Sequence, residues 1–366
     1  MKHKIFAGAL SAAVVAMTTA PVSAQQTQRF SAGKATEYAL VYSLPLTVLD
    51  ITVETEHIVK TPGEFMNYAK RYLSAEDAIR QASSEVRVKS VKIVPRGMAN
   101  PAERYAAQFK PGTNVSMLLT DGGVPLAINV ENAEMPAAPT LPVAVAAEPT
   151  PLETPAASQA ITQDISRASS QAKKAELMSQ RIFELREQRN DLISGNADNI
   201  PVDNGAMKVA IDNMDAQEAA LCAMFMGTTK TFTQVQTVSF VPGTSDSTGV
   251  VLARISPLEG AVDVLDLSGI PLTIDYKVDK KGVLPTNEKG ETKKFPKGGV
   301  AYVIPGTGTV TLNFNGRKVA SQTFDLAQLG VVFGLDPALF TDKKAPCYAD
   351  FSPVTGAVTR LDVIPE

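Results

Sequence analysis

The sequence has few of the side chains on which most enzyme mechanisms depend. It contains two histidines, two cysteines and no tryptophan among 366 residues. Histidine is the usual proton carrier near neutral pH and a frequent zinc ligand. Because His57 is the one histidine beyond residue 3, a zinc site rich in histidine is excluded. The lack of tryptophan disfavours a sugar-binding surface built on flat aromatic rings, although tyrosine can take that role.

Motifs for nucleophilic and phosphate chemistry are also missing. No serine occupies a G-x-S-x-G turn. Gly306 and Gly308 lack the lysine and the strand-to-helix context of a phosphate-binding loop. His57 lies at the end of an alternating strand pattern, so we expect it to have an ordinary role at the surface or at a strand end.

Paired carboxylates are the remaining enzyme chemistry. Two acids about 5 to 9 Å apart can hydrolyse a glycosidic bond, but no two acids here are marked as a pair. Calcium binding by Asp279 or by Asn287-Glu288 is opposed by neighbouring lysines and lacks EF-hand spacing. The sequence therefore predicts no catalytic residue, no metal site and no cofactor. The candidate acids near predicted strand ends are Asp263, Asp266, Asp275 and Asp279.

The charge balance gives no support for a nucleic-acid partner. The formal net charge is −3, whereas nucleic-acid-binding domains present a basic face. One local basic cluster is expected to be a solvated loop, with an anion or surface contact as the alternative. It comprises Lys289, Lys293, Lys294 and Lys297.

The first 24 residues have the layout of a secretory signal peptide. Two lysines precede an apolar run over residues 5–16, and small residues lead to a cleavage site between Ala24 and Gln25. The run is too short for a permanent membrane helix, so we expect a mature chain without a transmembrane span. We expect that chain in the periplasm, or associated with the outer membrane or cell surface, of a Gram-negative bacterium. In that compartment Cys222 and Cys347 are compatible with one disulfide, or with two separately buried thiols.

Residues 25–134 are expected to form a small β-rich domain. Apolar and polar residues alternate over 49–55, which is typical of a strand with one buried face. A change of parity predicts a bulge near Lys89-Ser90, and Asp121-Gly122-Gly123 predicts a hairpin turn. Thr61, Pro62 and Glu64 resemble the capping box of a short helix.

The middle of the chain is expected to be a linker followed by helices. Prolines are frequent over residues 135–157, which favours an extended, semi-rigid segment. Residues 158–227 read as an antiparallel helical hairpin. Its first helix is expected to run continuously from Ile161 and to end at Gly195. Asp203 is expected to cap the second helix and Gly227 to end it.

Residues 228–366 are expected to form an antiparallel β-sandwich or barrel, since short strands alternate with turn signals. Asn315-Gly316 is the strongest hairpin signal, because both residues accept a positive φ. The predicted fold class is therefore α+β and mostly β. Its strands are expected at 232–241, 250–255, 272–278, 300–304, 310–314, 350–351 and 358–363.

Several motifs in this order resemble one family of exported proteins from Bacteroides-type bacteria, domain of unknown function family 4831. That resemblance implies export into a Gram-negative envelope and brings no catalytic residues. Ser74 stands where the family pattern has glycine. The motifs are Tyr42–Thr47, Pro62-Gly63, Tyr68–Leu73, Lys89–Ile93, the helix over Arg181–Gly195, Asn199–Pro201 and Phe351–Ala357.

The modular layout and the missing catalytic motifs favour a non-enzymatic envelope protein of structural or protein-interaction type. We expect a protein partner in the envelope, and self-association through the helical hairpin is a further option. The alternatives are a glycan- or peptide-binding module and, less favoured, a carboxylate-dependent hydrolase.

Overall fold

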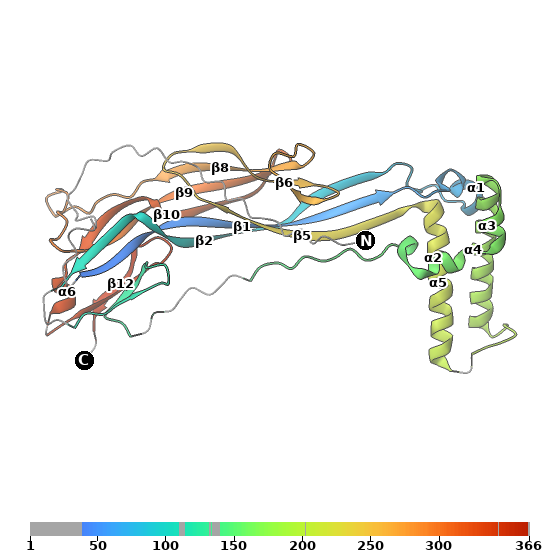
Figure 1. The fold of residues 1–366 in the computed structure, drawn as a ribbon, viewed down its shortest axis with the longest axis horizontal. Coiled ribbons are helices and arrows are strands. Elements are labelled where there is room, and N and C mark those ends of the chain that lie inside the picture. The colour runs from blue at the N-terminus through green and yellow to red at the C-terminus, as the bar shows by residue number, and fades with distance from the viewer. Residues whose placement is uncertain are drawn as a thin grey trace, which may run out of the picture.

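The computed structural model shows an elongated molecule with a β-rich body and helices at one end (Figure 1). It describes residues 39–364 apart from 110–113, 132, 134–139, 202 and 343. The cleavage site at Ala24 and Gln25 and part of the expected linker lie outside the described residues. The fold is mostly β, with 45% of residues in strands and 23% in helices. The strands form antiparallel sheets that curl into a half-barrel.

The first sheet has the order β2-β1-β5 and runs along most of the molecule (Figure 1). It contains β1 (Ala39–Thr61), β2 (Ser83–Gln108) and β5 (Thr228–Phe240). The predicted bulge is confirmed, because Glu54 pairs with Ser90 whereas Thr55 pairs with Val88, which leaves Lys89 as the extra residue.

The second sheet has the order β10-β9-β8-β6-β7. The Asn315-Gly316 turn is confirmed, with φ values of 50° and 70°. The two strands expected at 300–304 and 310–314 are parts of one strand that continues through Gly306 and Gly308. Glycine is needed at these positions, because a Cβ would collide with the backbone of Lys280 at Gly306 and with the side chain of Tyr276 at Gly308. The strands are β6 (Ser247–Ser256), β7 (Gly260–Val262), β8 (Ile270–Lys280), β9 (Val300–Phe314) and β10 (Arg317–Leu335).

A third sheet has the order β12-β11-β4-β3. It lies with the short helix α6 (Ala338–Thr341) at the end of the molecule opposite the helical hairpin (Figure 1). The hairpin turn at 121–123 lies between β3 and β4, as predicted. The strands are β3 (Met117–Leu119), β4 (Pro125–Ile128), β11 (Cys347–Phe351) and β12 (Val358–Val363).

The two β-rich segments, 25–134 and 228–366, do not form the separate domains expected from the sequence. β1 pairs with β5, and β4 pairs with β11. One apolar core joins Ile51 of β1 to Ile274 and Leu312 of the second sheet. A second core joins Tyr42 to Ala301 and Phe340. Strand alternation reveals which face of a strand is apolar, but it does not reveal which other strand covers that face.

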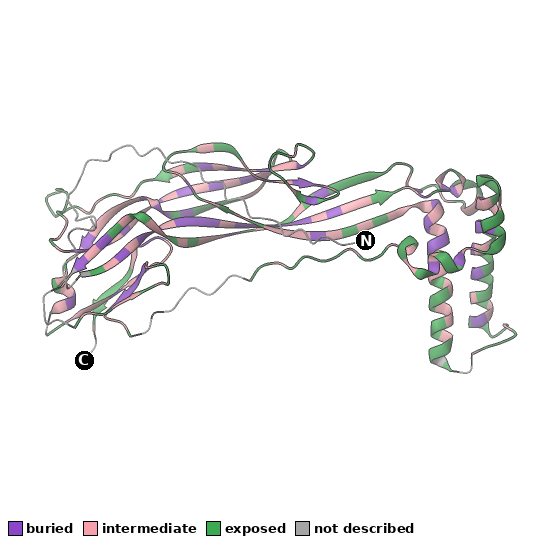
Figure 2. Cartoon of the chain, viewed as in Figure 1, coloured by how far each residue is buried: buried purple, intermediate pink, exposed green. Residues whose placement is uncertain are grey.

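The helical hairpin is present, and several of its predicted ends are confirmed. It consists of α4 (Gln171–Ser194) and α5 (Asn204–Met226). Gly195 ends α4 with φ of 79°, Asp203 accepts a hydrogen bond from the amide of Ala206, and Gly227 ends α5. Figure 2 shows the buried residues of both helices on their facing sides. They pack with Phe65 into a third apolar cluster.

The helix expected to begin at Ile161 is interrupted. The segment contains η2 (Pro151–Glu153), α2 (Pro155–Ala160), α3 (Gln163–Arg167) and only then α4. The side chains of Thr162 and Ser170 accept hydrogen bonds from the backbone amides three residues later in the chain. They are therefore N-caps, and α3 and α4 begin as new helices after them. In the described part of the expected linker, only residues 140–150 lack regular structure, because η2 begins at Pro151. There Val145 exchanges two hydrogen bonds with Thr233 of β5.

The expected capping box at Thr61 is wrong. Thr61 is the last residue of β1, and the helical turn begins only at η1 (Met66–Tyr68), which leads into α1 (Ala69–Leu73). Gly63 lies against the backbone of Met224, so close packing on α5 determines this turn in place of a side-chain cap. Ser74 ends α1 at φ of 55°, a conformation that glycine adopts more readily.

Thr47 and Gln328 connect β1, β10 and the 352–356 turn. The Thr47 hydroxyl donates to the carbonyl of Val354 and accepts from the amide of Ala327, both at 3.0 Å. The Gln328 side-chain amide bonds both the N–H and the carbonyl of Thr47 and also the carbonyl of Pro242. Thr47 is completely buried, so each of these polar groups depends on its protein partner.

Replacing Thr47 by valine keeps the side-chain shape but leaves the Ala327 amide and the Val354 carbonyl without their partner. We expect a loss of about 2 to 4 kcal/mol in the free energy of unfolding, measured by urea denaturation. Thr311→Val is the matched control, because the Thr311 hydroxyl is hydrogen-bonded at an exposed position, and it should change stability by less than about 0.5 kcal/mol. Equal losses in the two variants would contradict this role of Thr47.

Candidate functional site

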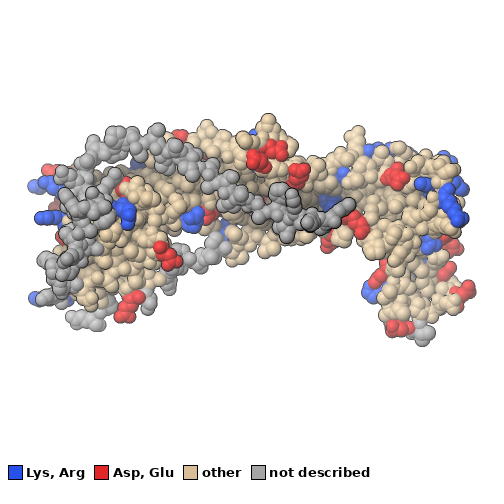
Figure 3. Space-filling model, in the orientation of Figure 1, with Lys and Arg blue, Asp and Glu red and all other residues tan. Residues whose placement is uncertain are grey.

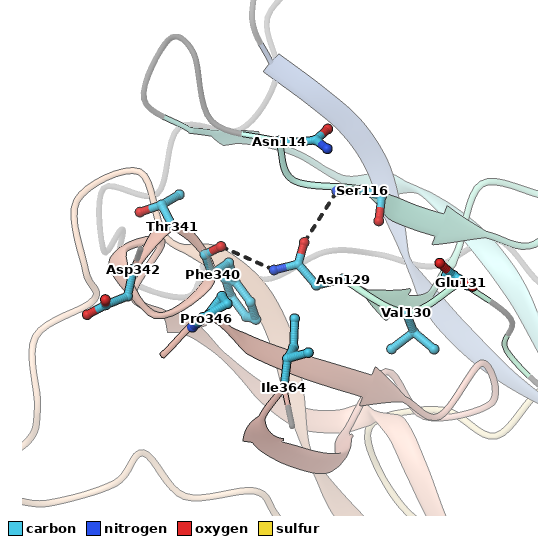
Figure 4. Close-up of a pocket in the computed structure, with 10 residues that line it drawn as sticks. All are labelled: Asn114, Ser116, Asn129, Val130, Glu131, Phe340, Thr341, Asp342, Pro346 and Ile364. Atoms are coloured by element: carbon cyan, nitrogen blue, oxygen red, sulfur yellow. Dashed lines mark hydrogen bonds between the residues drawn. The ribbon is translucent and has the colours of Figure 1, made fainter. Parts of the chain in front are cut away.

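A pocket of about 430 Å³ lies where β4, β11 and α6 meet (Figure 4). Asn129 stands at its centre with φ of 54°. Its side-chain N–H₂ donates to the carbonyls of Phe340 at 3.1 Å and Cys347 at 3.0 Å. Its own carbonyl oxygen accepts from the amide of Ser116 at 3.4 Å. The side chain thus joins three segments of the chain, and its polar atoms are engaged in holding the pocket together.

The acids of this pocket do not form a catalytic pair. Figure 4 shows Glu131 and Asp342 on opposite sides of it. Hydrogen bonds from the backbone amides of Lys344 and Ala345 lower the pKa of Asp342. The lining contains no histidine, lysine or cysteine to act as a base. The pocket has the size and polarity to hold a small polar molecule.

The four candidate aspartates are distributed over two places. Asp263 and Asp266 accept hydrogen bonds from backbone amides in the loop before β8. Asp275 and Asp279 lie on the solvent face of β8, bonded to Asn313 and Thr309. Four residues along a strand span about 13 Å, which is wider than the separation that glycosidases use. Wherever the pKa of a described carboxyl group is clearly shifted, the shift is downward, as at Asp266.

His57 is fully buried, unlike the surface residue that the sequence allowed. Its ring stacks on Phe232 with centroids 4.8 Å apart. Nδ1 lies 3.1 Å from the carbonyl of Pro257, to which it donates, and Nε2 is hydrogen-bonded to the hydroxyl of Thr55 at 2.9 Å. No serine or cysteine nucleophile is bonded to the ring, and the histidine fastens the β6–β7 turn to the first sheet.

The two cysteines are free thiols in different clusters. Cys222 lies in the helical cluster and Cys347 beside the core around Tyr42. These clusters are at opposite ends of the molecule (Figure 1), so the expected alternative of an intramolecular disulfide is not formed. Burial raises the pKa of the Cys222 thiol, which disfavours the reactive thiolate.

Other binding chemistries leave few traces in the described part of the chain. No described tyrosine is exposed, so the tyrosine platform that would favour glycan binding is not present there. Across the same residues, no three His, Cys, Asp or Glu side chains gather at a spacing that would hold a metal ion.

The helical hairpin carries exposed apolar side chains beside an ion-pair network. Phe183, Ile193 and Val209 are 50%, 64% and 67% exposed. Between the helices Glu218 accepts hydrogen bonds from Arg186 at 2.6 Å and Arg189 at 2.7 Å. Partial burial acts to raise the pKa of Glu218, but the hydrogen bonds and charges of the two arginines outweigh it and lower this pKa. The network holds α4 and α5 together and leaves the apolar side chains outside.

Sequence reasoning did not identify Asn129, Thr47 or Gln328. Asparagine is among the residues most tolerant of a positive φ, so the Asn129 position carried a weak turn signal. Thr47 lies in the motif Tyr42–Thr47, and its partner Val354 lies in Phe351–Ala357. Two of the motifs that carried the family resemblance are therefore in direct contact.

The role of Asn129 can be separated into conformation and hydrogen bonding. Asn129→Gly keeps the positive φ and loses the side-chain bonds, whereas Asn129→Ala loses both. We expect urea denaturation to order the stabilities as wild type, then glycine, then alanine, with each step about 1 to 2 kcal/mol. An alanine variant at least as stable as the glycine variant would show that the backbone conformation is not the constraint.

The Glu218 network predicts a loss of stability in acid. Because the pKa of Glu218 is lower in the folded chain, its contribution is present above the unfolded-state value and is lost as pH falls through the folded-state value. Thermal melting followed by far-UV circular dichroism should therefore show a larger fall between about pH 7 and about pH 3 for the wild type than for Glu218→Gln. Parallel falls in the two proteins would contradict the role of this carboxylate.

Comparison with known proteins supports the resemblance seen in the sequence. No curated protein and no solved structure shows significant similarity to this chain. A protein-family model does match, over residues 38–359, which is nearly the whole chain and includes the helical hairpin and every strand except most of β12. The chain belongs to the family described as "Domain of unknown function (DUF4831)".

Proposed function

We propose that this protein is an exported, non-enzymatic component of the cell envelope that acts by binding a partner protein through its helical hairpin. The observation that carries the proposal is the exposure of Phe183, Ile193 and Val209 on helices that the long first sheet places at one end of the molecule (Figure 1). Phe183 and Ile193 lie on α4 and Val209 lies on α5, and apolar surface left exposed on a monomer is characteristic of protein-contact sites where it forms a continuous patch.

The construction of the hairpin supports a contact role. Its inner face is filled by the cluster around Phe225 and Ile182, so the outer apolar residues are not needed for its own core. The Arg186 guanidinium lies 5.5 Å from the Phe183 ring centroid, which holds an aromatic and a cationic group together. Aromatic residues and arginine are the types most enriched at energetically important contact positions.

The chemistry of the remaining residues supports a role other than catalysis. The candidate aspartates bond to backbone amides, to Asn313 or to Thr309, and His57 has both ring nitrogens engaged. Export is proposed from the signal-peptide pattern ending at Ala24. Within the part of the chain that the structure describes, no helix combines the length and the apolar character needed to cross a membrane.

Site-specific photo-crosslinking in intact cells tests the hairpin contact. A photoreactive residue at Val209 should give a discrete higher-mass adduct containing a second envelope protein, identified by mass spectrometry. The same residue at Thr248, which is exposed on β6, is the matched control and should give no such adduct. Recovery of only the uncrosslinked chain from the Val209 position, or equal adducts from both positions, would contradict the proposal.

A further inference from the structure

The segment over residues 257–269, here called the leucine loop, includes the short strand β7 and carries the most exposed large apolar side chain in the described part of the chain. That side chain is Leu265, which is 86% exposed, and Leu267 and Leu258 of the same segment are 81% and 61% exposed. Exposed apolar surface of this kind costs hydration free energy unless another surface covers it.

The leucine loop has a defined conformation. The Arg254 guanidinium donates to the carbonyls of Val264 at 2.8 Å and Gly269 at 2.9 Å and so holds together the two sides of the stretch that contains Leu265 and Leu267. The carboxylates of Asp263 and Asp266 accept from backbone amides two residues on. These hydrogen bonds fix the backbone around Leu265 and Leu267, whose side chains remain exposed.

The leucine loop is also acidic. Glu259, Asp263 and Asp266 flank the leucines, and Arg254, the one cation over residues 250–270, is directed at backbone carbonyls. Figure 3 shows carboxylates gathered above the middle of the molecule, where β6 ends and β8 begins. The complementary surface must therefore be apolar and basic.

This chain has such a surface at the opposite end of β8. The loop over residues 281–299, here called the lysine loop, contains Val283 at 66% exposure and the half-buried Phe295. Among the described residues, no carboxylate forms an ion pair with any of its five exposed lysines, which makes them available to a partner. They outnumber the two carboxylates of the loop, Glu288 and Glu291. The lysines are Lys281, Lys289, Lys293, Lys294 and Lys297.

We propose that the leucine loop of one molecule docks on the lysine loop of a second copy of this chain. The two loops lie at the two ends of the eleven-residue β8, about 36 Å apart, so they cannot meet within one molecule. The contact is therefore head-to-tail, and such a contact extends into chains of molecules unless the rotation between copies closes a ring. The proposal is independent of the partner proposed for the helical hairpin.

Sedimentation velocity of the full chain, as processed in cells, tests this association over a series of concentrations. We expect the sedimentation coefficient to rise with concentration and the rise to weaken at high salt, because exposed charges contribute. Leu265→Ser with Leu267→Ser should weaken self-association on the order of 100-fold, with unchanged circular dichroism. Asp212→Lys, an exposed change on α5, is the matched control and should associate like the wild type.

A charge swap provides the decisive arm. One variant makes the leucine loop basic while keeping amide-bonding side chains in its turns, through Glu259→Lys, Ala261→Lys, Asp263→Asn and Asp266→Asn. A second variant makes the lysine loop acidic, through Lys289→Glu, Lys293→Glu, Lys294→Glu and Lys297→Glu. Each variant alone should stay monomeric, and their mixture should associate again, because every contact then joins opposite charges.

Three results would overturn the proposal. The first is a wild type that sediments as one monomeric species at every concentration. The second is a mixture of the two charge variants that stays monomeric although both are folded. The third is a monomeric wild type that co-floats with phosphatidylcholine vesicles in a manner dependent on Leu265 and Leu267, which would assign the leucine loop to a lipid surface. None of these results bears on crosslinking at Val209.

Discussion

The hydrogen bonds around Thr47 hold the two apolar cores of the body in one structure. Thr47 lies on β1 between Leu44 of one core and Leu49 of the other. β5 pairs with β1 only as far as Leu49 and Phe240, and two residues further in that register Thr47 faces Pro242, which has no N–H to donate. The side-chain amide of Gln328 takes the role of a strand partner here. It accepts a hydrogen bond from the N–H of Thr47 and donates to the carbonyls of Thr47 and Pro242.

This arrangement explains why the molecule is long. The 23-residue β1 pairs along one edge with the 26-residue β2. Its other edge also has backbone groups that need partners, and these are supplied by β5 and, beyond β5, by the side chain of Gln328. The result is a continuous sheet that separates the helical hairpin from the third sheet (Figure 1). The two surfaces for which contacts are proposed thus lie at different points along one elongated body (Figure 1).

Polar groups in the interior serve the fold more than chemistry. Asn129, His57 and Thr47 all have partners in the backbone of distant segments, such as Phe340, Pro257 and Val354. A buried donor or acceptor without its partner costs more than the bond contributes when it is formed, so such residues specify which segments meet. The exposed apolar residues, by contrast, have no role in the cores, and it is these that point to contacts with other molecules.

Local features could be predicted from the sequence because their causes lie within a few residues. The bulge at Lys89, the turn at Asn315-Gly316, the ends of α4 and α5 and the family resemblance all follow from side-chain parity, positive φ, capping or motif order. The breaks at Thr162 and Ser170 were missed, since an apolar stripe at helical spacing continues across them. The cap predicted at Thr61 was overruled by the packing of Gly63 on Met224.

The sequence by itself determined a mostly β chain with a helical hairpin, and it showed which faces of each strand are apolar. Only the tertiary structure decided that β5 joins β1, that Gln328 completes the edge of β1, and that Cys222 and Cys347 are far apart. The physical reason is that alternation and capping act over neighbouring residues. The choice among distant partners depends on which pairing covers every apolar face and satisfies every buried polar group at once.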